Sequence, residues 1–165
     1  MADDTLEQLI GTSTGRSVIT VERGHVARFA DAVQDPSPVY RDPRAASAAG
    51  LPGIPAPPTY PFVMGNFGRY PELQVDDDPP GSPVAALLGS LLAGGGLILH
   101  GEQELTYRRP VLVGDVLVGE GRVADAYRKE SGGHTMTFVV VETIWRDRDS
   151  GEEVTTSRMT VLHRS

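Results

Sequence analysis

The pattern of apolar and polar residues changes near residue 98. From Ile98 onward, long runs rich in Val, Thr, Tyr and Ile are separated by short turns that contain Gly, Ser and Asp. Runs of this kind are typical of β-strands joined by tight turns. We expect four consecutive antiparallel strands here: "ILHGEQELTYRRP", "DVLVGEGRVADAYRK", "HTMTFVVVETIWRD" and "EVTTSRMTVLHR".

The first part of the chain predicts one short strand and two helices. "RSVITV", residues 16–21, has strand composition. In "TVERGHVARFADAV" the apolar residues recur at helical spacing, so we expect an amphipathic helix with Thr20 as its N-cap. Pro36 and Pro38 prevent this helix from continuing. "RAASAAG" predicts a short helix that ends at Gly50.

The most apolar helical segment is "TYPFVMGNFGRY", Thr59 to Tyr70. Pro61 suits its first turn, where no backbone N–H is needed. The acidic, proline-rich sequence that follows indicates a surface loop, and we interpret residues 71–97 as a variable loop. Residues 1–14 are interpreted as an N-terminal tail and residues 15–165 as a single domain, which suits a chain of 165 residues.

A sheet with one apolar face must bury that face against another element. The natural cover is the apolar helix within Thr59 to Tyr70. We therefore predict an α+β hot-dog fold, in which a curved antiparallel five-stranded sheet wraps around this central helix.

Composition excludes several classes of function. The net charge of −7 argues against nucleic acid as a partner, which would require a clustered basic surface. No run approaches the roughly 20 apolar residues of a membrane span, and the acidic N-terminus is unlike a signal peptide, so we expect a cytoplasmic protein with no membrane partner. The absence of cysteine excludes a thiol nucleophile. The four histidines lack metal-ligand spacing, so we expect no metal and no cofactor.

Three segments together resemble a known family: "FADAVQDPSPVYRDPRAA", "APPTYPF" and "LHGEQELTYRRPVLVGDVL". Over roughly Gly15 to Ser165 the chain resembles the MaoC-like (R)-specific hydratases and dehydratases, in particular the FAS1-like or MaoC N-terminal dehydratase branch. The resemblance implies reversible addition of water to an α,β-unsaturated acyl thioester, carried by coenzyme A or an acyl carrier protein.

Catalytically complete members of that family resemble "G-D-x-N-P-x-H", where the Asp and the His act as general acid and base. Asp35 stands at the aspartate position, and Ser37 stands where Asn is usual. Tyr40 stands where the catalytic His is expected. The carboxylate is therefore retained and the imidazole is lost. A phenol titrates near 10, so it is a poor base at neutral pH.

The resemblance implies further site residues. Pro58, Thr59 and Tyr60 stand at the start of the hot-dog helix, where backbone N–H groups of the family polarise the thioester carbonyl. His100 could replace the missing base if the fold brings it near Asp35. Arg109 could meet the phosphates of the carrier arm, although only one of two neighbours on a strand, Arg108 or Arg109, can face a given site.

Simpler roles compete with these. The alternative role for Asp35 is to cap the turn that follows it, as Asp before Pro commonly does. The alternative for Tyr40 is a phenol packed at an interface, and the alternative for His100 is a structural histidine bonded to backbone.

Four functions follow. The first is a subunit of an enoyl-thioester hydratase or 3-hydroxyacyl-thioester dehydratase, paired with a second hot-dog subunit that carries an intact Asp/His pair. The second is a homodimeric enzyme that uses Asp35 with Tyr40 or His100. The third is a non-catalytic acyl-thioester-binding protein. The fourth, a thioesterase, usually needs a polar group on the central helix, where this segment offers only Thr59 and Asn66.

Overall fold

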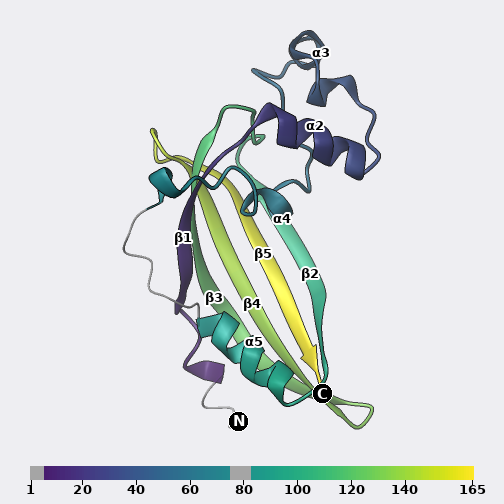
Figure 1. The fold of residues 1–165 in the computed structure, drawn as a ribbon, viewed down its shortest axis with the longest axis vertical. Helices are drawn as coiled ribbons and strands as arrows, with labels where there is room; N and C mark the ends of the chain where they lie inside the picture. Colours follow the sequence, from purple (N-terminus) through teal and green to yellow (C-terminus); the bar gives the residue numbers. More distant parts are fainter. Residues whose placement is uncertain (1–5, 75–82) are drawn as a thin grey trace.

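A computed structural model describes residues 6–74 and 83–165, and its main feature is a strongly curved five-stranded antiparallel sheet (Figure 1). The strands are ordered β1-β3-β4-β5-β2, so β1 and β2 form the two edges. Their bounds are β1 (Ser13–Thr20), β2 (Leu97–Tyr107), β3 (Val116–Ser131), β4 (His134–Asp147) and β5 (Glu153–Arg164). The four strands expected after residue 98 and the hot-dog architecture are confirmed.

The helices precede β2. They are α2 (Arg23–Ala32), α3 (Pro43–Ala48), α4 (Pro61–Met64) and α5 (Pro83–Ala93), with 3-10 turns at Pro38–Tyr40 and Pro71–Leu73. The cap of α2 is Glu22, and the expectation of Thr20 was wrong because Thr20 still pairs with Val116 in the sheet. The helix α3 has the expected end, since Gly50 adopts a positive φ of 78° shortly after it.

The expected central helix is much shorter than its apolar spacing suggested. Only Pro61–Met64 is helical, and Tyr60, Pro61 and Met64 are buried. Gly68 has a φ of 64°, and a Cβ there would lie 2.0 Å from the carbonyl oxygen of Thr20. The chain therefore turns back against β1 at this point instead of continuing as a helix.

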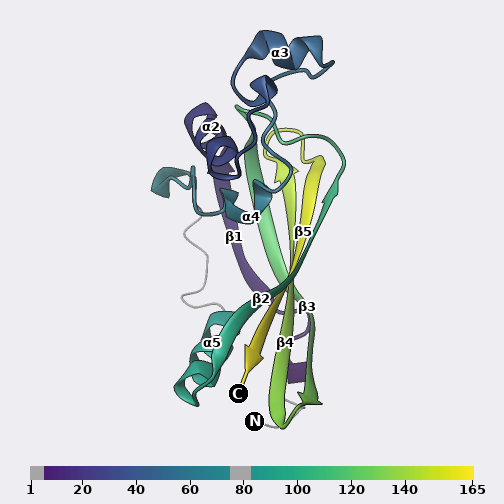
Figure 2. The ribbon, with the colours of Figure 1, turned by 90° about the vertical axis from the view of Figure 1, so that its right-hand side faces the viewer.

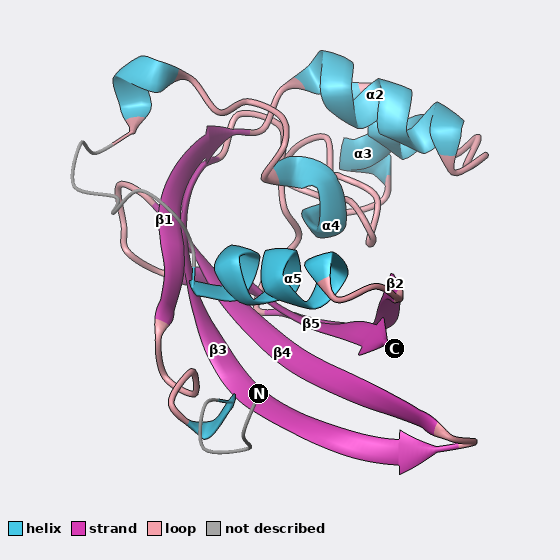
Figure 3. Ribbon diagram, turned by 60° about the horizontal axis from the view of Figure 1, so that its bottom comes forward, coloured by secondary structure: helices cyan, strands magenta, loops and turns pink. Residues whose placement is uncertain are grey.

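The segment interpreted as a variable loop contains the helix α5, so that expectation was wrong for residues 83–93. The helices α4 and α5 lie on the same concave face of the sheet (Figure 3). The helices α2 and α3 lie at one end of the sheet and α5 at the other (Figure 2). The sheet thus wraps around two helical pieces, where the sequence had indicated one.

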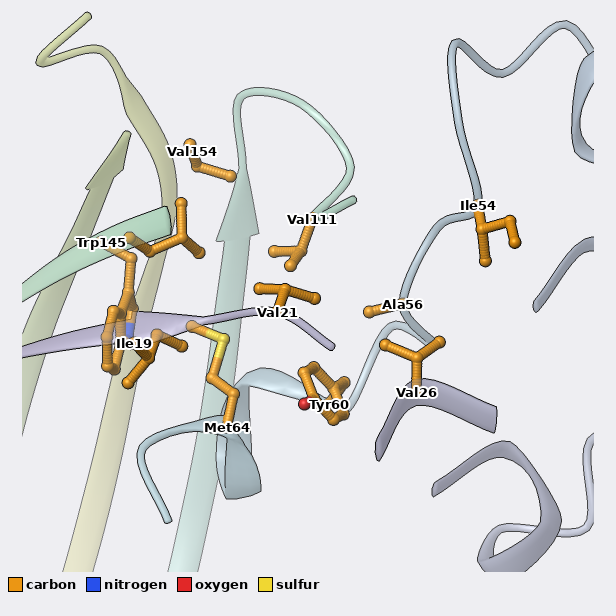
Figure 4. Close-up of a cluster of buried hydrophobic side chains, with 11 residues drawn as sticks. Ile19, Val21, Val26, Ile54, Ala56, Tyr60, Met64, Val111, Trp145 and Val154 are labelled. Carbon is orange, nitrogen blue, oxygen red and sulfur yellow. The ribbon is translucent and has the colours of Figure 1, made fainter. Parts of the chain in front are cut away.

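The apolar interior forms two clusters, one under each helical piece. The first packs Tyr60 and Met64 against Ile19 and Trp145 of the sheet (Figure 4), and it also includes Leu117. The second, around α5, is made by Leu6, Val84, Leu87, Val123, Ala126 and Val139.

Some expectations fall partly on residues that the structure does not describe. The acidic stretch "VDDDPP", residues 75–80, and the first five residues of the expected tail lie outside the described ranges. Leu6, which belongs to that tail, is buried in the α5 cluster, and the boundary at residue 15 stays a prediction. In the described ranges, no helix is long and apolar enough to cross a membrane. The cytoplasmic location also stays a prediction.

Candidate active site

A pocket of about 380 Å³ opens where β2 ends, and its walls are mainly apolar. It gathers residues from the loop after α2, from the proline-rich connection before α4 and from the end of β2. The lining residues are Tyr40, Pro55, Ala56, Pro58, Tyr107, Arg108, Arg109, Pro110 and Val111. Three residues predicted from the sequence, Tyr40, Pro58 and Arg109, therefore meet in one place.

The loop after α2 is held by its own polar groups. Asp35 accepts a hydrogen bond from the backbone N–H of Ser37 through Oδ1 at 3.0 Å, so its side chain closes the turn. The guanidinium of Arg41 donates to the carbonyl oxygens of Asp35 and Ser37 at 3.5 and 3.4 Å, and it also pairs with Asp31. The bond from Ser37 orients the carboxylate of Asp35, and the bonds from Arg41 hold the backbone of the turn.

Tyr40 lies beside Asp35. Burial raises the pKa of Tyr40, and the Asp35 carboxylate raises it further by its charge and by accepting a hydrogen bond from the phenol. Both causes favour the neutral form of Tyr40. This pair can hold a polar group by hydrogen bonds, but Tyr40 cannot remove a proton from water at neutral pH.

Tyr107 ties the end of β2 to the segment before α4. Its hydroxyl donates to the carbonyl oxygen of Pro58, and burial raises the pKa of Tyr107 to about 12. The backbone N–H of Ala56 donates to Val111 at 2.8 Å and strengthens the same junction. These two hydrogen bonds therefore hold together the two segments that form the apolar wall of the pocket.

The two arginines at the rim differ in their contacts. Arg109 forms a bidentate pair with Asp115 at 2.7 and 3.2 Å, and it also approaches Asp147 at 3.6 Å. Hydrogen bonds from Ser150 lower the pKa of Asp147, and the charge of Arg109 contributes to this shift. The side chain of Arg108 is 67% exposed and meets Glu153 at 3.4 Å. Arg108 and Arg109 both line the pocket. They follow Tyr107, the last residue of β2, so their side chains no longer alternate between the two faces of the sheet.

Five predicted residues lie outside the pocket lining: Asp35, Ser37, Thr59, Tyr60 and His100. Thr59 is exposed next to Pro58. Tyr60 is only 1% exposed and packs edge-on against Phe29, and burial with the nearby Glu22 charge raises its pKa to about 12. Its ring belongs to the core, so a role for it would involve its backbone.

His100 lies farther along β2 and contacts the ring of Phe62. It precedes Tyr107 by seven residues, which is roughly 20 Å along a strand. One chain alone does not bring His100 to Asp35. Among the described residues, no group of His, Asp and Glu side chains is arranged to hold a metal ion.

Sequence reasoning missed Tyr107 and the wall made by Ala56 and Val111. Tyr107 stands inside the quoted segment "LHGEQELTYRRP", directly before the two arginines, so its place in that segment was the available signal.

Comparisons with known proteins agree with this architecture. A UPF0336 protein of Thermobifida fusca is 33% identical over 137 residues, which cover 83% of this chain and 78% of that protein. The ChsH1-ChsH2 complex from Mycobacterium tuberculosis contains a chain with a TM-score of 0.75 and 22% identity, covering 96% of this chain and 88% of that chain. The HadBC (3R-hydroxyacyl-ACP dehydratase) complex from the same organism gives a TM-score of 0.68 and 19% identity, covering 93% and 96%.

At these identities the two solved structures are similar in fold alone. A family match decides the relationship: residues 8–157 match the family described as "FAS1-like, dehydratase domain region". This range contains the loop of Asp35 and Tyr40, the proline-rich connection and the whole pocket lining. The chain therefore belongs to the FAS1-like dehydratase domain family, and it has the hot-dog fold expected from its sequence.

Proposed function

We propose that this protein is an acyl-thioester-binding subunit of an (R)-specific enoyl-thioester hydratase or 3-hydroxyacyl-thioester dehydratase. The acyl group would be carried by coenzyme A or an acyl carrier protein. A second hot-dog subunit with an intact Asp/His pair would supply the general base. The observation that carries the proposal is the Asp35–Tyr40 pair, in which the carboxylate is kept and its neighbour is a neutral phenol.

Hydration requires a base that takes a proton from water while the water oxygen bonds to the β-carbon. It also requires an acid that gives a proton to the α-carbon. The carboxylate of Asp35 is suited to orient a water molecule, and Tyr40 can donate a hydrogen bond. Neither the carboxylate nor the phenol is a base comparable to an imidazole near neutral pH.

The pocket suits the two ends of such a substrate. Its apolar walls fit an acyl chain or the aliphatic part of the carrier arm. Arg108 stands at the rim with most of its side chain in solvent, so we assign it the contact with a carrier phosphate. Arg109 would act on the same site by holding the turn at Asp115. Ser37 and Thr59 remain proposed substrate contacts, from the loop and from the start of α4.

A partner subunit is supported by the position of β2. This strand forms an edge of the sheet, and Leu97 and Leu99 on it are exposed. An open edge with apolar side chains favours pairing with another strand. Both similar structures described above are complexes, ChsH1-ChsH2 and HadBC. We propose a heterodimer, with a homodimer as the alternative in which His100 of one copy could approach Asp35 of the other.

A non-catalytic acyl-thioester-binding role is the second candidate. It is favoured by the raised pKa of the Tyr40 phenol, which keeps this group neutral and therefore unable to act as a base.

Hydration of crotonyl-CoA and longer enoyl-CoAs tests the proposal. The purified chain is assayed alone and mixed with a second hot-dog protein that carries an intact Asp/His pair, and binding of a saturated acyl-CoA is measured by calorimetry. We expect acyl-CoA binding by the chain alone, but rapid hydration only in the mixture. Rapid hydration by the chain alone would contradict a shared site. Binding without hydration in either sample would favour the non-catalytic role.

A further inference from the structure

The two edges of the sheet differ in how far their backbone is open. The second half of edge β1 is covered by the chain itself: the carbonyl oxygen of Gly68 accepts a hydrogen bond from the N–H of Thr20 at 2.9 Å. The side-chain amide of Gln74 accepts from the N–H of Val18 at 3.0 Å and donates to the carbonyl oxygen of Val18 at 2.8 Å. In the described ranges, β2 pairs with β5 alone, so its outer side is open along the whole strand (Figure 1).

The open strand carries charge of one sign. The sequence of β2, "LILHGEQELTY", contains two glutamates and no lysine or arginine. Glu102 and Glu104 are both exposed, and within residues 6–74 and 83–165 neither forms an ion pair. An edge strand is a template for another strand, and its charges decide which strands can join it.

The two glutamates lie on the same face of the sheet. They line one shallow pocket together with Val140 of β4. The next residue, Val139, packs in the α5 cluster, and successive side chains of a strand point to opposite faces. Glu102 and Glu104 therefore lie on the convex face, away from the helices.

The surroundings of this pair do not neutralise it. Asp125 lines the same pocket, where Arg158 is the one basic residue among the described lining residues. Arg158 lies 3.9 Å from Glu142, a carboxylate that is outside the pocket lining. The convex surface beside the open edge is thus negative.

Self-pairing of β2 would bring these charges together. The strand runs from Leu97 to Tyr107, so Glu102 is its middle residue. When two identical antiparallel strands overlap over their full length, the two-fold axis passes through the middle. Glu102 of one copy then meets Glu102 of the other, with both Glu104 carboxylates nearby on the same face. Like charges that face each other across a strand pair are destabilising.

We propose that Glu102 and Glu104 select a different chain at β2: an edge strand that carries Lys or Arg at the positions facing them. This partner is the second hot-dog subunit of the function proposed above, so the inference rests on that function. The exposed Leu97 and Leu99 supply apolar contact to any strand that joins the edge. The two carboxylates favour a basic strand and disfavour a second copy of this chain.

Charge reversal supplies a partner of the required chemistry. The double variant Glu102→Lys/Glu104→Lys is purified, and sedimentation velocity is measured on the parent chain, on the variant and on their equimolar mixture, at low and at high salt. We expect each protein alone to sediment as a monomer at micromolar concentration, and the mixture to form a one-to-one dimer. High salt should weaken the mixed dimer, because exposed charges are screened.

A neutral variant tests the repulsion by itself. Glu102→Gln/Glu104→Gln keeps the shape of both side chains and should self-associate about tenfold more tightly than the parent, as expected when two or more like-charge contacts are lost. The matched control is Asp149→Lys/Glu152→Lys, which makes the same change of net charge at exposed positions between β4 and β5. It should stay monomeric, alone and mixed with the parent. Circular dichroism checks that each variant is folded.

A homodimer of the parent chain at low salt would overturn the proposal. So would a mixture of parent and charge-reversed variant that stays monomeric, or a mixed dimer formed equally well by the control variant. If the charge-reversed variant is poorly folded, the neutral variant decides, and self-association no tighter than that of the parent overturns the proposal.

Binding of a saturated acyl-CoA, measured by calorimetry on the same proteins, separates this result from the proposed function. Glu102 and Glu104 lie outside the lining of the first pocket, so their variants should bind acyl-CoA as the parent does. A parent chain that binds no acyl-CoA would contradict the acyl-thioester role, whereas the sedimentation result alone decides which strand joins β2.

Discussion

The phenol of Tyr40 lies beside the carboxylate of Asp35, and burial together with this negative charge raises the pKa of Tyr40. This contact joins the two ends of a loop that the backbone N–H of Ser37 and the guanidinium of Arg41 also hold. Asp35 closes the turn, as its sequence allowed, and it lies beside Tyr40 of the pocket lining, whereas a catalytic role for it stays a prediction. The chemistry that the loop can support depends on whether a phenol or an imidazole lies beside this carboxylate.

Tyr40→His should raise enoyl-CoA hydration by the isolated chain, because an imidazole near pH 6.5 can act as the base that a neutral phenol cannot. The measurement is the initial rate with crotonyl-CoA. Tyr40→Phe is the matched control and should leave the low rate unchanged. Asp35→Asn should abolish whatever activity the isolated chain has. If Asp35→Asn leaves a measurable rate intact, the base lies elsewhere, and His100 would be the next residue to test.

Arg109→Ala should lower the free energy of unfolding by about 1–3 kcal/mol, since it removes a bidentate pair from the partly buried Asp115. Arg108→Ala should change it by less than about 0.5 kcal/mol, because Arg108 is mostly exposed. Urea denaturation measures both.

The same two variants separate stability from binding. Arg108→Ala should raise the KM for a CoA thioester, but not for a thioester that lacks the carrier phosphates. An unchanged KM with both thioesters would remove Arg108 from the site without affecting the assignment of the pocket.

Gly68→Ala should destabilise the protein by more than about 2 kcal/mol. The new Cβ would be placed 2.0 Å from a backbone oxygen, and the positive φ adds strain. Gly89→Ala in α5 is the control: nothing lies within 4 Å of its Cβ position, so a gain of about 0.5–1 kcal/mol is expected there. Thermal unfolding of the two variants should shift in opposite directions. Equal effects would mean that the turn at Gly68 is not as described.

Stability should fall as the pH rises from about 10 to 12. Tyr60 and Tyr107 have pKa values raised to about 12, against an ordinary value of 10, so in this window the folded protein holds protons that the unfolded chain releases. This stabilisation is fully present below pH 10, and it is lost as the pH rises through the pKa of these two tyrosines in the folded protein. Urea denaturation at pH 9 to 12 measures the slope, which is at most about 1.4 kcal/mol per pH unit for each proton.

Tyr60→Phe removes one of these phenols and keeps the ring in the core, so it should flatten the slope. The same slope in the variant and the parent would show that Tyr60 does not contribute to the alkaline loss.

The sheet could be predicted from sequence because each long strand has its own apolar pattern and its own turn. The helices could not be placed as well. The spacing of Tyr60, Val63, Met64 and Phe67 fits a longer helix, but Gly68, with its positive φ, lets the chain turn back to β1. The helix α5 is apolar around most of its circumference, so it lacks the polar stripe by which a covering helix is usually recognised.

The candidate site, too, could be predicted from the sequence only in part. Asp35 and Tyr40 are five residues apart in one loop, so their proximity followed from local sequence and from the family resemblance. Tyr107 joins them from the far end of β2, and its bond to Pro58 depends on the completed sheet. The failure of His100 to reach the loop has the same cause, because strand length separates it from the pocket.

The division of the interior into two clusters makes the two ends of the molecule mutationally independent. Substitutions far apart and without shared neighbours have nearly additive effects. The pocket lined by Tyr40 and Pro58 rests on the α4 cluster, whereas Leu87 and Val123 belong to the α5 cluster. Natural variation can therefore lengthen, shorten or re-sequence α5 while the chemistry beside Asp35 stays unchanged. Relatives should differ most in this helix.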